Sequence, residues 1–275
     1  MSIVRTLRIL ASQRPSLPPR ALAAPRRVAR RRHGNVPVTW IDADLSSTAT
    51  IVHLHGGSYV AGEKTAHWEW LEEVGRRSGA ATAMVHYRLA PTYPYPAAIE
   101  DVLHAIDAMG EQALLRPGRW VLSGDGAGAG LALAVAQTLA AAGGDAPALL
   151  LLESPWADLT EYAATTGGLS HAAARLYAGA VPAENPRISP LRGDLGSLPP
   201  VHLITGTEDE VVQDARRLRE GIAAGGGTVE YVEIPGAGHS VALTGATADA
   251  QSARRTQIAA VRQAVGLDAA PAPSA

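Results

Sequence analysis

Short apolar runs recur along this chain, and stretches with a different period separate them. Runs of about five Val, Ile, Leu and Ala residues are typical of strands buried on both faces, as in a parallel sheet. Between them, Ile99, Val102, Ile106 and Met109 recur at helical spacing. This alternation predicts an α/β protein with a mostly parallel sheet and helices on both faces. We expect strands at 36–43, 49–55, 80–86, 119–124, 147–153, 200–206 and 228–234.

The length of 275 residues, 47% of them hydrophobic, fits one domain with a full core. Its first strand is expected to begin at Val36, so residues 1–35 are expected to form a basic N-terminal arm with a short cap helix. The main domain is expected over 36–267, and a disordered tail over 268–275. Residues 160–198 separate two expected strands by much more than an ordinary loop, which indicates a cap insertion there.

Charge and composition exclude several classes of function. A formal net charge of −2 gives no general attraction to nucleic acid or anionic lipid. The arm before Asp42 has no acidic residue and could dock on either, but the weak net charge argues against this as the main function. No apolar run is long enough for stable membrane insertion. We therefore expect a cytoplasmic protein with a small-molecule partner, and a homodimer is left open.

Residues 123–128 read SGDGAG and lie between an expected strand and an expected helix. This is the context in which an α/β-hydrolase presents its nucleophile, and Gly126 stands at the apex of the turn. The apex of such a turn has a positive φ, which strains a residue other than glycine by about 1–3 kcal/mol. Taken alone, the stretch fits an ordinary glycine-rich turn or a phosphate-binding loop equally well.

A second glycine pair, Gly56 and Gly57, follows an earlier expected strand. Backbone N–H groups there can approach a ligand oxygen and stabilise the oxyanion of a tetrahedral intermediate. A plain turn is the alternative. His53 and His55 lie beside this pair and could be two metal ligands. The sequence shows no further cluster of ligand residues to join them, so we expect no metal and no cofactor.

An acidic residue and a histidine follow in the order that the hydrolase fold requires. Asp209 lies just after an expected strand, and His239 lies in a glycine-rich loop after the next. Glu208 and Glu210 flank Asp209, so the choice among the three acids rests on spacing. The alternatives are a group of solvated acids at the start of a helix and an isolated surface histidine.

Together these motifs resemble the hormone-sensitive-lipase-like carboxylesterases, whose bacterial members hydrolyse mostly short-chain acyl esters. The resemblance runs from about Val36 to about Val265. It includes HGGSY at 55–59, where the family usually has HGGG and an aromatic residue, and YRLAP at 87–91, PYPAAIED at 94–101, SPWAD at 154–158 and NPRISPL at 185–191. It implies the α/β-hydrolase fold, with a small helical cap formed by residues before Val36 and by 160–187.

Carried over by position, the resemblance makes His239 the general base and Asp209 the acid that orients it. Oxyanion-hole N–H groups would come from Gly56, Gly57 and Ala127. Asp125 would be a buried structural partner.

The departure from the family is Gly126, which occupies the position of the nucleophilic serine. A glycine has no oxygen with which to form an acyl-enzyme. Ser123, Ser58 and Asp125 are the candidate substitutes. Neither serine is expected to project from the turn toward His239, and the resemblance makes Asp125, a possible carboxylate nucleophile, a buried structural partner instead.

Three interpretations remain open. The chain is an esterase scaffold whose serine was removed, or changed in a designed sequence, which the absence of Phe and the single Lys would suit. Alternatively, it is a natural pseudoenzyme that binds a small acyl ligand, or a hydrolase or lyase in which His239 and Asp209 act without a covalent intermediate.

Overall fold

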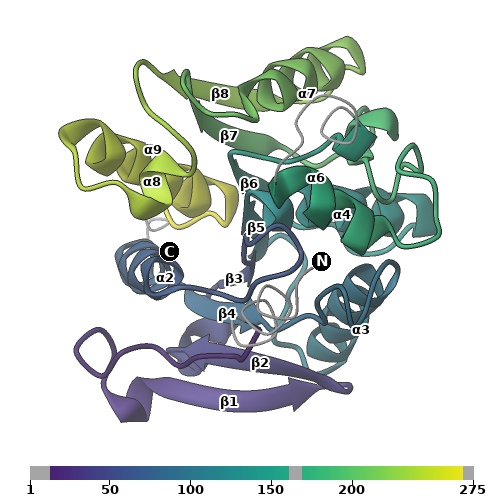
Figure 1. Ribbon diagram of the computed structural model, residues 1–275. Helices are drawn as coiled ribbons and strands as arrows, with labels where there is room; N and C mark the ends of the chain where they lie inside the picture. The colour runs from purple at the N-terminus through teal and green to yellow at the C-terminus, as the bar shows by residue number, and fades with distance from the viewer. Residues whose placement is uncertain (1–12, 161–168, 269–275) are drawn as a thin grey trace.

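The computed structural model describes residues 13–160 and 169–268, which fold around one eight-stranded sheet (Figure 1). The strand order is β1-β2-β4-β3-β5-β6-β7-β8. Strands β1 and β2, and β2 and β4, pair antiparallel, and the other neighbours pair parallel. The strands are β1 (Val28–His33), β2 (Val36–Ile41), β3 (Thr50–Leu54), β4 (Ala81–Val85), β5 (Trp120–Asp125), β6 (Leu149–Glu153), β7 (Val201–Gly206) and β8 (Val229–Ile234).

Helices cover both faces of the sheet (Figure 1). Helices α3 (Ala97–Glu111), α4 (Ala127–Ala142) and α7 (Val212–Ala224) lie on one face, and α2 (Thr65–Ser78) and α9 (Ala248–Ala264) on the other. The short helix α8 (Val241–Thr244) contacts α2 and α9, and the ring of Tyr177 in α6 (Leu169–Ala178) stacks on that of Tyr59. The α/β-hydrolase architecture expected from the sequence is confirmed.

The strand period explains how one sheet supports two cores. Val52 and Leu54 of β3 point into the core under α3, α4 and α7, whereas Ile51, the residue before Val52, points into the core under α2 and α9. Successive side chains of a strand leave on opposite faces, so a strand that is apolar at every position is buried on both sides. The same alternation divides β5 and β6 between the two cores.

The N-terminal boundary requires a correction. We expected no strand before Val36, but Val28–His33 forms the edge strand β1, antiparallel to β2. Its Arg30, Arg31 and Arg32 are exposed. Exposed arginines fit the loose arm that we expected, but they also fit an edge strand, where charged side chains discourage pairing with other chains. His33 is buried and accepts a hydrogen bond from the indole of Trp40 at 3.0 Å.

The remaining boundary expectations fall largely outside the described residues. The cap helix near the N-terminus lies in 1–12, the start of the cap insertion in 161–168 and nearly all of the tail in 269–275. Within the insertion, α6 is the described α-helix, and Pro190–Arg192 forms a short 3-10 helix. Among the helices described, none is both long and apolar enough to cross a bilayer.

Helix α4 approaches strands β3 and β5 very closely where it begins. A Cβ added to Gly128 would lie 2.0 Å from the carbonyl oxygen of Leu54, and one added to Gly124 would lie 2.4 Å from that of Gly128. No side chain fits at these separations. The glycines therefore permit the contact that places the turn between β5 and α4 at the edge of the sheet.

We predict that Gly128→Ala lowers the free energy of unfolding by about 2–4 kcal/mol, because its methyl group would overlap the backbone of β3. Gly110→Ala is the matched control, since a Cβ there meets nothing within 4 Å and the helix gains about 0.5–1 kcal/mol. Denaturant unfolding followed by circular dichroism measures both. Equal stability of Gly128→Ala and the parent would contradict the packing argument.

Candidate active site

The turn between β5 and α4 holds Gly126 in a conformation that few other residues adopt. Its φ is 52° and its ψ is −118°, and its N–H donates to the carbonyl of Glu153 at 2.9 Å. A Cβ built on Gly126 would lie 3.1 Å from Nε2 of His239. A side chain at this apex would therefore point directly at the imidazole.

His239 and Asp209 come together from loops that follow neighbouring strands. His239 follows β8, Asp209 follows β7, and Nδ1 of His239 lies 2.9 Å from Oδ1 of Asp209. Asp209 also accepts hydrogen bonds from the hydroxyl of Thr205 at 3.2 Å and from the N–H of Val211 at 3.0 Å. The carboxylate is thus fixed in the protein, while the His239 side chain is 44% exposed.

Each member of this pair changes the pKa of the other. Burial alone would lower the pKa of His239, but the hydrogen bond and negative charge of Asp209 outweigh burial and raise it. Burial would raise the pKa of Asp209, but the hydrogen bond and charge of His239 lower it. The pair is therefore suited to hold a proton on the imidazole next to position 126.

The glycine loop after β3 faces the same point, with one correction to the expected residues. Gly57, Ser58 and Ala127 line the pocket. The N–H of Gly56 instead donates to Oδ1 of Asp125 at 2.7 Å, so it is directed into the protein. Gly56 thus anchors the loop and does not face a ligand. Ser58 lines the pocket, where we expected Gly56.

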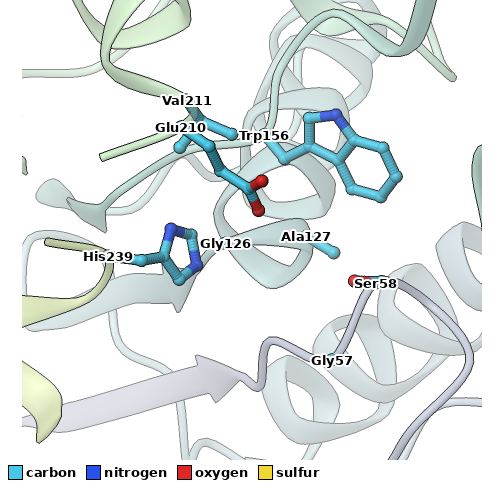
Figure 2. Close-up of a pocket in the computed structure, with 8 residues that line it drawn as sticks. All are labelled: Gly57, Ser58, Gly126, Ala127, Trp156, Glu210, Val211 and His239. Atoms are coloured by element: carbon cyan, nitrogen blue, oxygen red, sulfur yellow. The ribbon is translucent and has the colours of Figure 1, made fainter. Parts of the chain in front are cut away.

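These groups enclose a cavity of about 50 Å³ (Figure 2). Trp156, Glu210 and Val211 complete its lining. Figure 2 shows the Glu210 carboxylate extending into the cavity between His239 and Trp156. We did not single out Glu210 or Trp156 for the pocket, although SPWAD and the residues around Asp209 were recognised as motifs.

The three candidate substitute nucleophiles are placed as follows. The hydroxyl of Ser123 is buried 2.8 Å from Nδ1 of His53. Asp125 is buried beneath the glycine loop, and neither residue lines the pocket. Ser58 lines the pocket but lies across it from His239 (Figure 2).

One group among the described residues brings metal-ligand atoms together: His53, His67 and Asp125, all buried. Oδ1 of Asp125 lies 3.2 Å from Nε2 of His67 and 3.5 Å from Nε2 of His53. Nδ1 of His67 accepts the N–H of Lys64 at 2.8 Å, so a neutral His67 carries its proton on Nε2, facing Asp125. Burial opposes the charge on His67, but Asp125 outweighs it and raises the pKa. We interpret the group as a charge-balanced cluster under the glycine loop, with a proton where a metal would bind.

Comparison with known proteins identifies the family. Residues 51–243 match a family described by the alpha/beta hydrolase fold. An acetyl-hydrolase of Streptomyces hygroscopicus is 37% identical over 214 residues, which cover 74% of this chain and 71% of the relative. The carboxylesterase NlhH of Mycobacterium tuberculosis is 28% identical over 218 residues, covering 73% and 68%.

Solved structures give the same relationship. An esterase from the bacterial hormone-sensitive lipase family superposes with a TM-score of 0.78 at 28% identity, covering 87% of this chain and 84% of that one. A hormone-sensitive lipase from a metagenome library superposes with a TM-score of 0.79 at 27% identity, covering 96% and 92%.

We predict that Asp209→Asn lowers the pKa of His239, because the amide removes the charge that stabilises the imidazolium. The raised pKa contributes stability below the ordinary histidine value of about 6.5, and this is lost as pH rises through the folded value. The melting-temperature gap between parent and variant should therefore be widest below that pH.

Proton NMR titration of the imidazole tests this directly. Asp107→Asn makes the same charge change at an exposed position on α3 and should leave the His239 titration in place. An unchanged His239 pKa in Asp209→Asn would show that the 2.9 Å contact does not hold in solution.

Proposed function

The chain belongs to the hormone-sensitive-lipase-like carboxylesterases of the α/β-hydrolase fold, and from this membership we propose that it is a short-chain ester hydrolase lacking only its nucleophile. The observation that carries the proposal is the 3.1 Å separation between a Cβ at position 126 and Nε2 of His239. In this proposal His239 is the base, Asp209 is the acid that orients it, and position 126 is where the nucleophilic hydroxyl would stand.

The geometry supports the following roles when a serine stands at position 126. His239 removes the hydroxyl proton, and Asp209 stabilises the imidazolium that results. The alkoxide attacks the ester carbonyl, and the backbone N–H groups of Gly57, Ser58 and Ala127 stabilise the oxyanion. His239 then protonates the departing alcohol, and water releases the acyl group.

A glycine at the apex removes the first covalent step. Loss of the nucleophile in a serine hydrolase reduces kcat about 10⁶-fold, which corresponds to roughly 8–9 kcal/mol. Relief of backbone strain at the apex stabilises the fold by only about 1–3 kcal/mol. The loss in catalysis therefore far exceeds the gain in stability, and we propose that the chain as it stands is inactive or strongly impaired.

The size of the pocket supports the choice of a short-chain acyl ester. The cavity between Trp156 and His239 has a volume of about 50 Å³, which is small beside the roughly 300–1,000 Å³ of pockets that hold drug-sized ligands. The similarity to an acetyl-hydrolase agrees with a small acyl group. From the sequence we further propose that a cap, formed in part by α6, covers this pocket. We also propose a cytoplasmic location.

One alternative activity has a specific observation in its favour. The imidazole of His239 is partly exposed to the pocket and its pKa is raised by Asp209, so it could activate water beside the oxyanion donors without a covalent intermediate. Such an activity would depend on His239 and not on a hydroxyl at 126. A pseudoenzyme that binds an acyl ligand would depend on neither.

We predict that Gly126→Ser raises the hydrolysis of p-nitrophenyl acetate by several orders of magnitude. The imidazole has to retreat by a few tenths of an ångström to admit the serine Cβ, and the fold should lose about 1–3 kcal/mol from apex strain. Gly79→Ser is the matched control, because Gly79 also has a positive φ, of 73°, but meets nothing within 4 Å of its Cβ position.

The outcomes separate the alternatives. Activity in Gly126→Ser that is abolished by adding His239→Ala supports the proposal. Turnover by the unaltered chain that is lost in His239→Ala supports non-covalent hydrolysis. A folded Gly126→Ser that stays inert while short acyl ligands raise its melting temperature supports the binding role and contradicts the proposal.

A further inference from the structure

A buried glutamate at the end of β6 contacts the loop that carries His239. Glu153 is only 3% exposed, and its Oε1 accepts the N–H groups of Ala242 at 2.5 Å and of Leu243 at 3.1 Å. These N–H groups belong to α8, which begins two residues after His239. The carboxylate therefore holds the backbone on the C-terminal side of the imidazole.

The main chain around Glu153 contacts the other parts of the site. The Glu153 carbonyl accepts the N–H of Gly126 at 2.9 Å. The hydroxyl of the next residue, Ser154, accepts the N–H of Ser240 at 2.9 Å. Ser154 and Ser240 both have positive φ, of 49° and 51°, so both segments are held in uncommon conformations. One strand end thus fixes the apex and the histidine loop relative to each other.

We propose that Glu153 is a positioning residue that sets the distance between His239 and position 126. The inference rests on the proposed function for its catalytic consequence, but the placement of the imidazole is a property of the chain as it stands. A misplacement of about 1 Å in such a site can reduce the rate about 100-fold.

The groups around Glu153 raise the pKa of its carboxyl. Burial, together with the charge of Asp125, its register partner on β5, raises the pKa of Glu153 to about 7 against the hydrogen bonds from α8 and Gln257. Gln257 of α9 donates to Oε2 at 3.3 Å. Arg254, also of α9, pairs with Glu73 and donates to the Ala242 carbonyl. Asp125 is itself paired with His53 and His67, as described above.

Ionisation of Glu153 has two effects on His239. Hydrogen bonds to a carboxylate are stronger than those to a neutral acid, so the loop is held more firmly above pH 7. The negative charge also raises the pKa of His239. The fold itself favours the protonated acid, so the stability contributed by Glu153 is complete below the ordinary glutamate pKa and is lost as pH rises through about 7.

Two substitutions of Glu153 separate its role as a hydrogen-bond acceptor from the effect of its negative charge. Glu153→Leu removes both and leaves the α8 N–H groups without a partner, whereas Glu153→Gln keeps an acceptor oxygen and removes the charge. Asp101→Leu is the matched control for loss of stability. Asp101 is likewise buried and accepts a backbone N–H, from Arg88 at 2.8 Å, but has no contact with the His239 loop.

The first measurement uses the chain with Gly126 in place. NMR follows the His239 titration and the exchange protection of the Ala242 and Leu243 amides. Glu153→Leu should lose this protection by at least tenfold, Glu153→Gln should retain it, and both should lower the His239 pKa. Asp101→Leu should change neither. Unchanged protection in a folded Glu153→Leu would overturn the inference, as would an unchanged His239 pKa in Glu153→Gln.

The second measurement adds each substitution to Gly126→Ser and assays p-nitrophenyl acetate. Glu153→Leu should reduce kcat by about 10–100-fold with KM within about threefold, and Glu153→Gln should restore most of kcat with a flatter pH profile between 6 and 8. An equal loss in Asp101→Leu would overturn the inference. If Glu153→Leu does not fold, Glu153→Gln decides. An inactive Gly126→Ser would overturn only the proposed function, because the NMR measurement needs no serine.

Discussion

The close crossing of helix α4 over strands β3 and β5 is the constraint on which the rest of the site depends. Backbones approach there to separations that only glycine permits, as the 2.0 Å from a Gly128 Cβ to the Leu54 carbonyl shows. The crossing forces the chain through a tight turn whose apex, Gly126, has a positive φ. It also brings the N-terminus of α4 beside the glycine loop after β3, so the apex and the oxyanion donors meet at one point.

Buried carboxylates hold the groups that converge on this point. Asp125 anchors the glycine loop through the N–H of Gly56 and lies against the buried His53 and His67. Asp209 holds the imidazole of His239, and Glu153 holds the backbone that follows it. Each of these acids lies at the carboxyl end of a parallel strand or just beyond it, where an open α/β sheet offers its binding sites.

Much of the fold follows from local pattern, because buried parallel strands read as continuous apolar runs and the motifs lie at strand ends. Patterns failed where long-range contacts decide. By sequence, the Arg-rich segment of β1 resembles a loose arm, but in the fold it pairs with β2. By sequence, Gly56 resembles an oxyanion donor, but its N–H donates to Asp125, 69 residues away. His67 and Glu153 carry no motif of their own, since their partners lie on other elements of the fold.

We propose that His239, Asp209 and the oxyanion donors converge on position 126, where only a nucleophilic hydroxyl is missing. Mass spectrometry after treatment with an active-site-directed phosphonate tests it most directly, because a phosphonate captures only a hydroxyl that a base has activated. We predict one adduct on Gly126→Ser, mapped to the new serine, and none on the unaltered chain. An unlabelled Gly126→Ser, or an adduct on the unaltered chain at another hydroxyl such as Ser58, would show that position 126 is not the site of the nucleophile.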